Sequence, residues 1–472
     1  MTTTNQYDLL IIGGGSAGLT AAGFAVKFGA SVAIVEKGRL GGDCTWTGCV
    51  PSKALLKAAK VAQQNRTGDR YGLPVTDEPI DLGRVMDWVH SVVADVAADE
   101  TPEGLGADGI DVITGGATFV DPHTVEVDGR RITASKIILA TGARPVLPSV
   151  EGLADVECLT YQDVWDLRDL PERLVVIGCG PVGSEFAQAF ARLGSSVTQV
   201  EFADRMLPQE DPDISALMTA VFDGEGVEQI FGAGVSRVWR EDDGIHLQVD
   251  ERELVCDRVL YATGRRPVVD GLDLEAAGVL FDHSGIRVDD AMRTSAKHIY
   301  AVGDCNGSPQ FTHYAGWQGA MAARNAILPG TSPGTVELVP RVTFTDPEVA
   351  SVGLSEADAR ALHDDVVVSK RPMSRVDRAI TEGSGDGVVK AVHRRDGTIL
   401  GVTIVAPPAG EMIHEWIVAM KAGQKMGDMA QALHAYPTYS LGAQQLAAEV
   451  RLAGALGGIS GRLAKQLSRV VR

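Results

Sequence analysis

One pattern of glycines occurs twice in this chain and constrains its fold more than any other feature. In each copy a short apolar run is followed by G-x-G-x-x-G, a helical stretch, a second apolar run and a glutamate. The glycines are Gly13, Gly15 and Gly18 in the first copy, and Gly178, Gly180 and Gly183 in the second. Gly13 to Glu36 spans 23 positions, and Gly178 to Glu201 also spans 23. The equal spacing predicts two similar strand–turn–helix–strand units, one after the other.

Each unit has the residues that a dinucleotide site needs. The glycines permit a tight turn and a close approach to a pyrophosphate, and the acid accepts a hydrogen bond from a ribose hydroxyl. A second echo supports the duplication, because ILATGARP at 138–145 reappears within VLYATGRRP at 259–267. The sequence therefore predicts an α/β fold with two Rossmann-like modules. Glu201 favours NADH, since an acid there repels a 2′-phosphate. Arg205, four residues on, is the nearest base, and a base that reaches the 2′-phosphate would favour NADPH instead.

Two cysteines lie in the segment GGDCTWTGCVPSK, residues 41–53, after the first unit. Pro51 is typical of the first turn of a helix, and Ser52 to Ala62 continues with helical character. Cys49 is therefore expected at a helix N-terminus, where the helix dipole and free N–H groups favour the reactive thiolate. A glycine-preceded turn can bring Cys44 back to Cys49. We interpret the two as a redox-active pair, with two unrelated structural cysteines as the alternative.

Composition narrows the classes of function. The 472 residues carry a net charge of −19, which argues against nucleic acid as the main partner. The remaining cysteines are scattered singly, which fits a reducing, cytoplasmic compartment better than a disulfide framework. They are Cys158, Cys179, Cys256 and Cys305. We expect no signal peptide and no integral membrane segment, because no window approaches about eighteen unbroken apolar residues.

The segment at 41–53 closely resembles the active-site segment of the pyridine nucleotide–disulfide oxidoreductases, and the resemblance covers nearly the whole chain. That family includes dihydrolipoamide dehydrogenase, glutathione reductase and mercuric reductase. The resemblance implies that Cys44 is the interchange thiol, which attacks the substrate, and that Cys49 is the charge-transfer thiol, which faces a flavin. It also implies that Lys53 contacts the flavin and forms an ion pair with Glu185. The alternative for Glu185 is an exposed acid in the first turn of its helix.

The same resemblance implies the cofactors. FAD would bind the first module and NAD(P)H the second, so electrons would pass from nicotinamide to flavin to the cysteine pair. KIILATGAR, with Thr141 and Gly142, and IYAVGDC, with Asp304, resemble two further flavin-binding segments. Ala315, at the start of the next helix, would lie near the flavin ring. Gly264 holds the place of Gly142 in the second echo and is also assigned to cofactor binding. No resident metal site is predicted.

Four segments are expected along the chain. Residues 1–150 would form the first part of the FAD-binding domain, 151–272 the NAD(P)-binding domain, and 273–335 the second part of the FAD-binding domain. Residues 336–472 would form an α+β interface domain, through which members of the family dimerise. A proline- and glycine-rich stretch precedes this last segment. Within the first segment, Val112–Phe119 and Thr124–Val127 are predicted to be strands.

The interface segment departs from the disulfide-reducing members at their acid–base pair. Those enzymes have His-Pro-Thr, with a glutamate five residues after the histidine, whereas this chain has HAYPTYSL. Tyr436 takes the histidine position and Leu441 the glutamate position, and a tyrosine with a pKa of about 10 is a poor base. His434, two residues upstream, replaces that base only if the loop is rebuilt.

Mercuric reductases also have a tyrosine at the position of Tyr436. Two other features of those enzymes are missing. No cysteine follows Cys305 to form their C-terminal metal relay, and residues 98–104, ADETPEG, lack their second tyrosine.

We therefore expect an FAD-dependent NAD(P)H oxidoreductase with a redox-active Cys44–Cys49 pair. Its acceptor would be a small molecule or metal ion, either a soft metal ion such as Hg²⁺ or a small disulfide. The alternatives are a dihydrolipoamide dehydrogenase and a redox-sensing flavoprotein that acts on a protein partner. The resemblance also implies a homodimer. The basic stretch 451–472 is interpreted as a helix that clasps the dimer, with a helix that binds a membrane surface or an acidic partner as the alternative.

Overall fold

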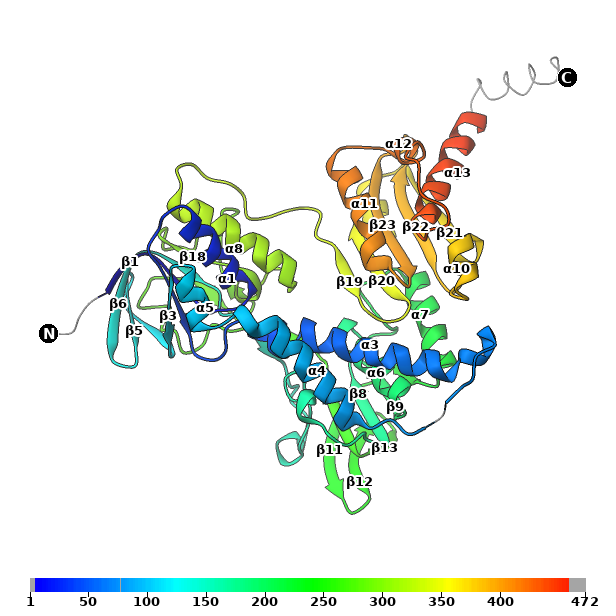
Figure 1. The fold of residues 1–472 in the computed structure, drawn as a ribbon, viewed down its shortest axis with the longest axis horizontal. Coiled ribbons are helices and arrows are strands. Elements are labelled where there is room, and N and C mark those ends of the chain that lie inside the picture. The colour runs from blue at the N-terminus through cyan, green and yellow to red at the C-terminus, as the bar shows by residue number, and fades with distance from the viewer. Residues whose placement is uncertain (1–4, 77, 458–472) are drawn as a thin grey trace. The chain divides into compact units, whose positions relative to one another are not determined.

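The computed structural model describes residues 5–76 and 78–457 (Figure 1). Within these residues the chain forms two compact units, which are described one at a time. The first unit contains 5–178, 189–197 and 234–336, and the second contains 179–188, 198–233 and 337–457. The second glycine module thus contributes residues to both units.

A largely parallel sheet forms the centre of the first unit. Its strand order is β3-β2-β1-β6-β5-β4, and β18 also pairs with β6. The bounds are β1 Asn5–Ile12, β2 Val32–Glu36, β3 Ile110–Thr114, β4 Ala117–Asp121, β5 Thr124–Val127, β6 Arg130–Leu139 and β18 Ile299–Ala301. In β1, Leu9 and Ile11 enter one hydrophobic core and Leu10 and Ile12 another. A strand buried on both faces is typical of the middle of a parallel sheet.

Helices α1 and α8 of the first unit pack side by side (Figure 1). Helix α1 (Ser16–Lys27) follows the first glycine turn, and α8 (Thr312–Ile327) follows β18. They approach closely at Gly319, where an added Cβ would lie 2.2 Å from the carbonyl oxygen of Ala17. Further helices of the first unit lie between β2 and β3. They are α2 Gly42–Trp46, α3 Cys49–Arg66, α4 Leu82–Val96 and α5 Pro102–Ala107.

The backbone repeats the same turn at both glycine patterns. Strand β8 (Arg173–Ile177) leads into the second turn, which is followed by α6 (Pro181–Leu193) and β9 (Ser196–Glu201). Gly13 and Gly178 both have φ at 108°, a region that favours glycine. A Cβ on Gly13 would lie 2.3 Å from the carbonyl oxygen of Ala140, and one on Gly178 2.6 Å from that of Ala262. Ala140 and Ala262 are the first residues of the two Ala-Thr-Gly segments. In each module this segment therefore packs against the glycine turn.

The remaining strands of the first unit form smaller sheets. Strand β14 (Arg258–Tyr261) pairs in parallel with β8, and β7 (Ala143–Pro145) pairs antiparallel with β15 (Arg265–Pro267). An antiparallel sheet has the order β11-β12-β13, and a two-stranded ribbon joins β16 to β17. Their bounds are β11 Val235–Glu241, β12 Gly244–Val249, β13 Arg252–Cys256, β16 Phe281–Asp282 and β17 Gly285–Ile286.

The second unit is built on a five-stranded antiparallel sheet of order β19-β20-β23-β22-β21. The bounds are β19 Arg341–Thr343, β20 Glu348–Gly353, β21 Val366–Pro372, β22 Val388–Arg394 and β23 Ile399–Ala406. Its helices are α7 Pro212–Gly224, α9 Glu356–Leu362, α10 Asp377–Thr381, α11 Ala409–Lys421, α12 Met426–Met429 and α13 Leu441–Gly457. Strand β10 (Glu228–Phe231) pairs in parallel with the end of β9. The core of the unit surrounds the fully buried Trp416. The predicted α/β class is thus confirmed.

A buried lysine joins three elements of the second unit. Lys390, on β22, is only 1% exposed. Its Nζ lies 2.8 Å from Asp211 and 2.7 Å from Asp213, at the start of α7, and 3.1 Å from Glu356 of α9. Burial opposes the charged amine, but the hydrogen bonds to these carboxylates raise its pKa. Because a buried charge is costly without partners, the cluster fixes α7 and α9 on the sheet.

The structure differs from the sequence-based expectation in local details. The single strand predicted at 112–119 is interrupted at Gly115, whose φ is 142°, so β3 ends and β4 begins in a different sheet position. The helix expected from Ser52 already begins at Cys49. None of the described helices is long and apolar enough to cross a membrane. Most of the basic residues noted in 451–472 lie outside the described residues.

Candidate active site

The two motif cysteines lie together on adjoining helices of the first unit. Cys44 is in the short helix α2, rather than in a turn, and Cys49 is the first residue of α3. Gly48 allows the chain to fold back between them, because an added Cβ there would lie 2.8 Å from the carbonyl oxygen of Asp43. Both cysteines are free thiols, and their side chains hydrogen-bond to each other. The geometry therefore brings together the two sulfurs that a reversible disulfide needs.

The electrostatics distinguish the two sulfurs. The hydrogen bond to Cys49, burial, and the negative charge of Cys49 all raise the pKa of Cys44. These effects disfavour a negative charge on Cys44, and Cys49 lies at the N-terminus of an 18-residue helix. Partial positive charge at a helix N-terminus stabilises a thiolate. The helix N-terminus expected at Cys49 is therefore present, and its role as the thiolate stays a prediction.

Asp43 anchors the helix that carries Cys44, and sequence reasoning missed it. Its carboxylate accepts hydrogen bonds from the Tyr161 hydroxyl at 2.8 Å and from Gln162 Nε2 at 3.3 Å. The guanidinium of Arg265 lies 3.5 Å from the same carboxylate. The partners are more than a hundred residues away in the chain, so only the redox motif itself pointed to this site.

Arg265 also joins this region to Asp304. Its Nη2 lies 2.7 Å from the Asp304 carboxylate, which is 9% exposed. Burial raises the pKa of Asp304, and the positive charge of Arg265 opposes that rise. Among the described residues, the buried Nε of Arg265 has no hydrogen-bond partner. A buried donor without a partner, beside a buried acid, suits a polar ligand such as the flavin chain predicted here.

The acids at the ends of β2 and β9 have matching surroundings. Glu36 accepts hydrogen bonds from the N–H groups of Gly14 at 2.6 Å and Gly38 at 2.7 Å. Glu201 accepts them from Cys179 at 2.6 Å and Ala203 at 2.9 Å. In each module the acid thus holds the residue after the first glycine. The narrow glycine turns and the oriented carboxylates fit a dinucleotide in both modules.

The other predicted cofactor residues lie at or near these turns. Gly15 forms a backbone bridge with Gly41 of the redox motif. Thr141 donates a hydrogen bond to the carbonyl oxygen of Val268 at 2.6 Å, so its hydroxyl supports the chain. Ala315, on α8, contacts Gly303, where an added Cβ would lie 3.1 Å away. The remaining predicted glycines are Gly18, Gly142, Gly180, Gly183 and Gly264.

Lys53 and Glu185 belong to different units, so their predicted ion pair stays a prediction. Lys53 lies in the second turn of α3, where its Nζ donates to the Ser52 hydroxyl at 3.2 Å. Glu185 is 8% exposed and accepts a hydrogen bond from the N–H of Phe344 at 2.9 Å. Its burial rules out the alternative of an exposed acid. Arg205, the base that follows Glu201 in the sequence, donates a hydrogen bond to the carbonyl oxygen of Pro208 at 2.9 Å.

Tyr436 takes the position in the interface segment at which the resemblance implied a base. Tyr436 is 70% exposed, and its hydroxyl donates to Asp377 at 2.9 Å. This hydrogen bond to a carboxylate raises the pKa of Tyr436, so the hydroxyl is a still weaker acid. Leu441 begins α13 and offers no carboxylate.

His434 forms a different histidine–glutamate pair. Its Nε2 lies 2.7 Å from Glu415 of α11, and its Nδ1 lies 3.0 Å from the carbonyl oxygen of Ala432. Burial alone would lower the pKa of His434, but the hydrogen bonds to Glu415 and Ala432 raise it. Since both ring nitrogens face acceptors, these contacts favour the doubly protonated ring. The partner glutamate lies 19 residues upstream, where the family pattern gave no reason to look for it.

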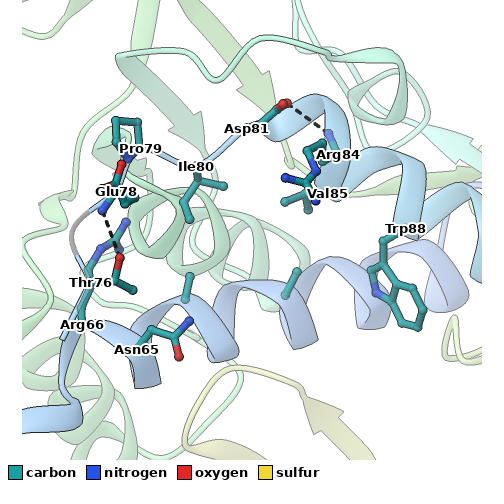
Figure 2. Close-up of a pocket in the computed structure, with 12 residues that line it drawn as sticks. Asn65, Arg66, Thr76, Glu78, Pro79, Ile80, Asp81, Arg84, Val85 and Trp88 are labelled. Atoms are coloured by element: carbon teal, nitrogen blue, oxygen red, sulfur yellow. Dashed lines mark hydrogen bonds between the residues drawn. The ribbon is translucent and has the colours of Figure 1, made fainter. Parts of the chain in front are cut away.

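Two other features lie apart from the predicted site residues. A cleft of about 440 Å³ lies between α3 and α4, where Figure 2 shows Asn65, Arg66, Arg84 and Trp88 among its lining residues. None of the predicted site residues lines it. His246 of β12 lies between two acids, with Nε2 at 2.8 Å from Asp243 and Nδ1 at 2.7 Å from Glu253. The hydrogen bonds to these acids raise the pKa of His246.

Comparison with known proteins identifies the family. The model of the pyridine nucleotide-disulphide oxidoreductases matches residues 7–319, and the model of their dimerisation domain matches residues 339–447. A mercuric reductase of Bacillus cereus is 36% identical over 443 residues, which are 93% of this chain and 70% of the relative. A dihydrolipoyl dehydrogenase of Thermus scotoductus is 36% identical over 456 residues, with 93% and 96% covered.

A solved structure gives the same result. The Cu(II) complex of the HOCl-induced flavoprotein disulfide reductase RclA from Escherichia coli superposes with a TM-score of 0.87 and 29% identity. The match covers 95% of this chain and 100% of that one. Family members use NAD(P)H and FAD. The chain therefore belongs to the pyridine nucleotide-disulphide oxidoreductase family and is an NAD(P)H-dependent flavoprotein of the disulfide-oxidoreductase type.

Proposed function

We propose that this enzyme passes electrons from NADH through FAD and the Cys44–Cys49 pair to a thiophilic metal ion, with Hg²⁺ as the reference acceptor. The observation that carries the proposal is Tyr436, a hydrogen-bonded tyrosine at the position where relatives that reduce disulfides have a base. Similarity to a mercuric reductase supports the same acceptor class. The structural relative with bound Cu(II) adds copper as a second acceptor to test.

The proposed roles follow the sequence analysis. Cys44 contacts the acceptor, Cys49 carries the thiolate next to the flavin, and Lys53 and Glu185 pair beneath it. FAD is held by the first glycine turn with Glu36, and by Thr141, Gly142, Asp304 and Ala315. NADH is held by the second turn with Glu201 and by Gly264. When bound, FAD accepts a hydride equivalent and returns two electrons to the cysteine pair.

Metal reduction removes the need for the missing base. A thiol that leaves a disulfide must be protonated, and the histidine of disulfide-reducing enzymes supplies that proton. A soft metal ion held by thiolates accepts electrons without such a step. The overall reaction balances as NADH and Hg²⁺ giving NAD⁺, H⁺ and Hg⁰, with the dithiol restored. Tyr436 would act as a neutral donor or ligand rather than as a base.

Dihydrolipoyl dehydrogenase is the second candidate, and one observation favours it. The 2.7 Å pair of His434 and Glu415 has the composition of the missing dyad. Its histidine is two residues from the usual position, but its glutamate comes from α11, upstream of the histidine. Both ring nitrogens of His434 are engaged, however, so the ring must give up a hydrogen bond before it can transfer a proton. A redox sensor that reacts with a protein partner is the third candidate.

The remaining expectations belong to the same proposal. The dimerisation model that matches residues 339–447 supports a homodimer, in which the interface segment 336–472 would pair with its copy. The other proposed segments are 1–150 and 273–335 for FAD and 151–272 for NAD(P)H. A cytoplasmic location is proposed because the reactive pair must be kept reduced by NADH.

The test compares acceptors under anaerobic conditions. The purified enzyme is mixed with NADH and then with Hg²⁺, Cu²⁺ or lipoamide in separate cuvettes, and NADH consumption is recorded. We expect turnover with Hg²⁺ or Cu²⁺ that is lost in Cys44→Ser. Faster turnover with lipoamide, lost in His434→Gln and kept in Tyr436→Phe, would establish the dehydrogenase instead. Turnover with none of the three, from an enzyme that NADH still reduces, would favour the sensor.

A further inference from the structure

A threonine hydroxyl lies within hydrogen-bond distance of an active-site sulfur. Thr312 Oγ1 is 3.2 Å from Cys49 Sγ. Hydrogen bonding by the same side chain also lowers the pKa of Cys44. Thr312 was not singled out by any motif, and it lies 263 residues from Cys49 in the chain. The contact is therefore a product of the folded unit.

Two helices and a serine fix the position of this hydroxyl. Thr312 is the first residue of α8, a helix of 16 residues, and its carbonyl oxygen accepts a hydrogen bond from Ser16 of α1 at 3.3 Å. Cys49 is the first residue of α3. The N-termini of two long helices therefore meet at the sulfur pair, and each favours negative charge there. The hydroxyl adds a directed donor to this field.

We propose that Thr312 is a further catalytic residue, whose one hydroxyl proton is donated to whichever of the two sulfurs carries the negative charge. This inference rests on the proposed roles of Cys44 and Cys49 and deepens them. A hydroxyl has one hydrogen, so it can donate to only one sulfur at a time. Rotation about the Cβ–Oγ bond redirects that hydrogen from Cys49 to Cys44.

The transfer balances without an external base. In the dithiol form, the pair holds one proton and one negative charge, with the proton on Cys44 and the charge on Cys49. The proton moves along the hydrogen bond from Cys44 to Cys49, and the Thr312 hydroxyl turns toward the new thiolate on Cys44. No electron is transferred and no proton leaves the pair. Cys44 becomes the nucleophile that meets the acceptor.

The electrostatics of Cys44 agree with this role. The hydrogen bond to Cys49, burial and the charge of Cys49 raise its pKa, and the hydrogen bond from Thr312 is the interaction that opposes them. Without the hydroxyl, each thiolate loses a donor. A charge-assisted hydrogen bond is stronger than a neutral one, so its loss should be measurable as a shift in titration.

The experiment titrates the thiolate rather than turnover. The enzyme is reduced by NADH without oxygen or acceptor, and the long-wavelength charge-transfer absorbance is followed against pH. In Thr312→Val we expect the midpoint to rise by about one to two pH units, because a hydrogen bond to a charged group is lost. Thr312→Ser, which keeps the hydroxyl, should titrate like the parent. Thr20→Val is the matched control, because its hydroxyl donates to Ser16 in its own helix at 2.8 Å.

The outcomes separate this inference from the proposed function. If the charge-transfer band titrates at the same pH in Thr312→Val as in the parent, the role of Thr312 alone is overturned. Absence of the band in the parent would overturn the thiol assignments and, with them, this inference. If Thr312→Val binds FAD poorly, the pH dependence of iodoacetamide labelling of Cys49, read by mass spectrometry in FAD-free protein, gives the same comparison. The expected midpoint again rises in the valine variant and not in the serine variant.

Discussion

Replacement of Lys390 by methionine should weaken the second unit by about 3 kcal/mol. Removing one partner of a buried ion pair typically costs about 3–5 kcal/mol, because the other charge stays buried without compensation. Two of the three carboxylates keep another cation. Asp213 keeps Lys370 at 2.8 Å, and Glu356 keeps Arg360 at 2.9 Å. Asp211, which is 5% exposed, has no other cation among the described residues but keeps the Glu356 N–H at 3.1 Å, so we place the cost at the lower end of the range.

Hydrogen exchange measures this loss where it occurs. Peptides from β22 and β23 should exchange faster in Lys390→Met, and the ratio of rates gives the change in opening free energy. Urea unfolding at one fixed protein concentration gives an independent value. The double variant Lys390→Met with Asp211→Asn should recover about half of the loss, because the orphaned charge is removed. Both variants keep the strand itself intact.

Lys370→Met is the control for this prediction. Lys370 pairs with the same Asp213, but its side chain is 45% exposed. An exposed pair of this kind is worth less than about 1 kcal/mol. Equal losses for Lys370→Met and Lys390→Met would refute the reasoning, because burial would then have no bearing on the cost.

Three further predictions concern the two modules and a surface hairpin. Cys49→Ser should abolish the charge-transfer absorbance while FAD stays bound; a retained band would exchange the roles of the two thiols. Glu201→Ala should lower the ratio of kcat/KM for NADH over NADPH by about tenfold, since a hydrogen bond between a charged acid and the ribose is lost, and an unchanged ratio would remove the residue from cofactor choice. Because hydrogen bonds to Asp243 and Glu253 raise the folded pKa of His246, its stabilising contribution is complete below the unfolded pKa of about 6.5 and is lost as pH rises through the folded value. The difference in Tm between parent and His246→Gln should therefore shrink from pH 6 to alkaline pH, and a constant difference would contradict this assignment.

The features predicted from the sequence are those set by neighbouring residues. The glycine turns, the acids at the ends of β2 and β9, and the position of Cys49 at the start of α3 depend on local spacing. A glycine with positive φ, a proline in a first turn and an apolar strand leave signals within about thirty residues. These signals placed both modules correctly.

The contacts that complete the site join distant residues and leave no such signal. Tyr161 is 118 residues from Asp43, and Thr312 is 263 residues from Cys49. A threonine before a helix is usually interpreted as a helix-start residue. Likewise, Glu415 precedes His434 in the chain, whereas the family pattern has its glutamate after the histidine. Only the folded units bring these side chains together.

Glu36 and Glu201 each accept two backbone N–H groups, which has a consequence for cofactor engineering. Immobilising a free glutamate side chain on binding costs roughly 1.5–2 kcal/mol in conformational entropy. Here folding has already immobilised it, so the incoming ribose finds an acceptor of fixed direction. One of the two bonds in each module also holds the glycine turn, however, and the other holds the loop after the acid. Any substitution that changes the sugar preference therefore also loosens the phosphate loop, and a useful design must supply new acceptors for both N–H groups.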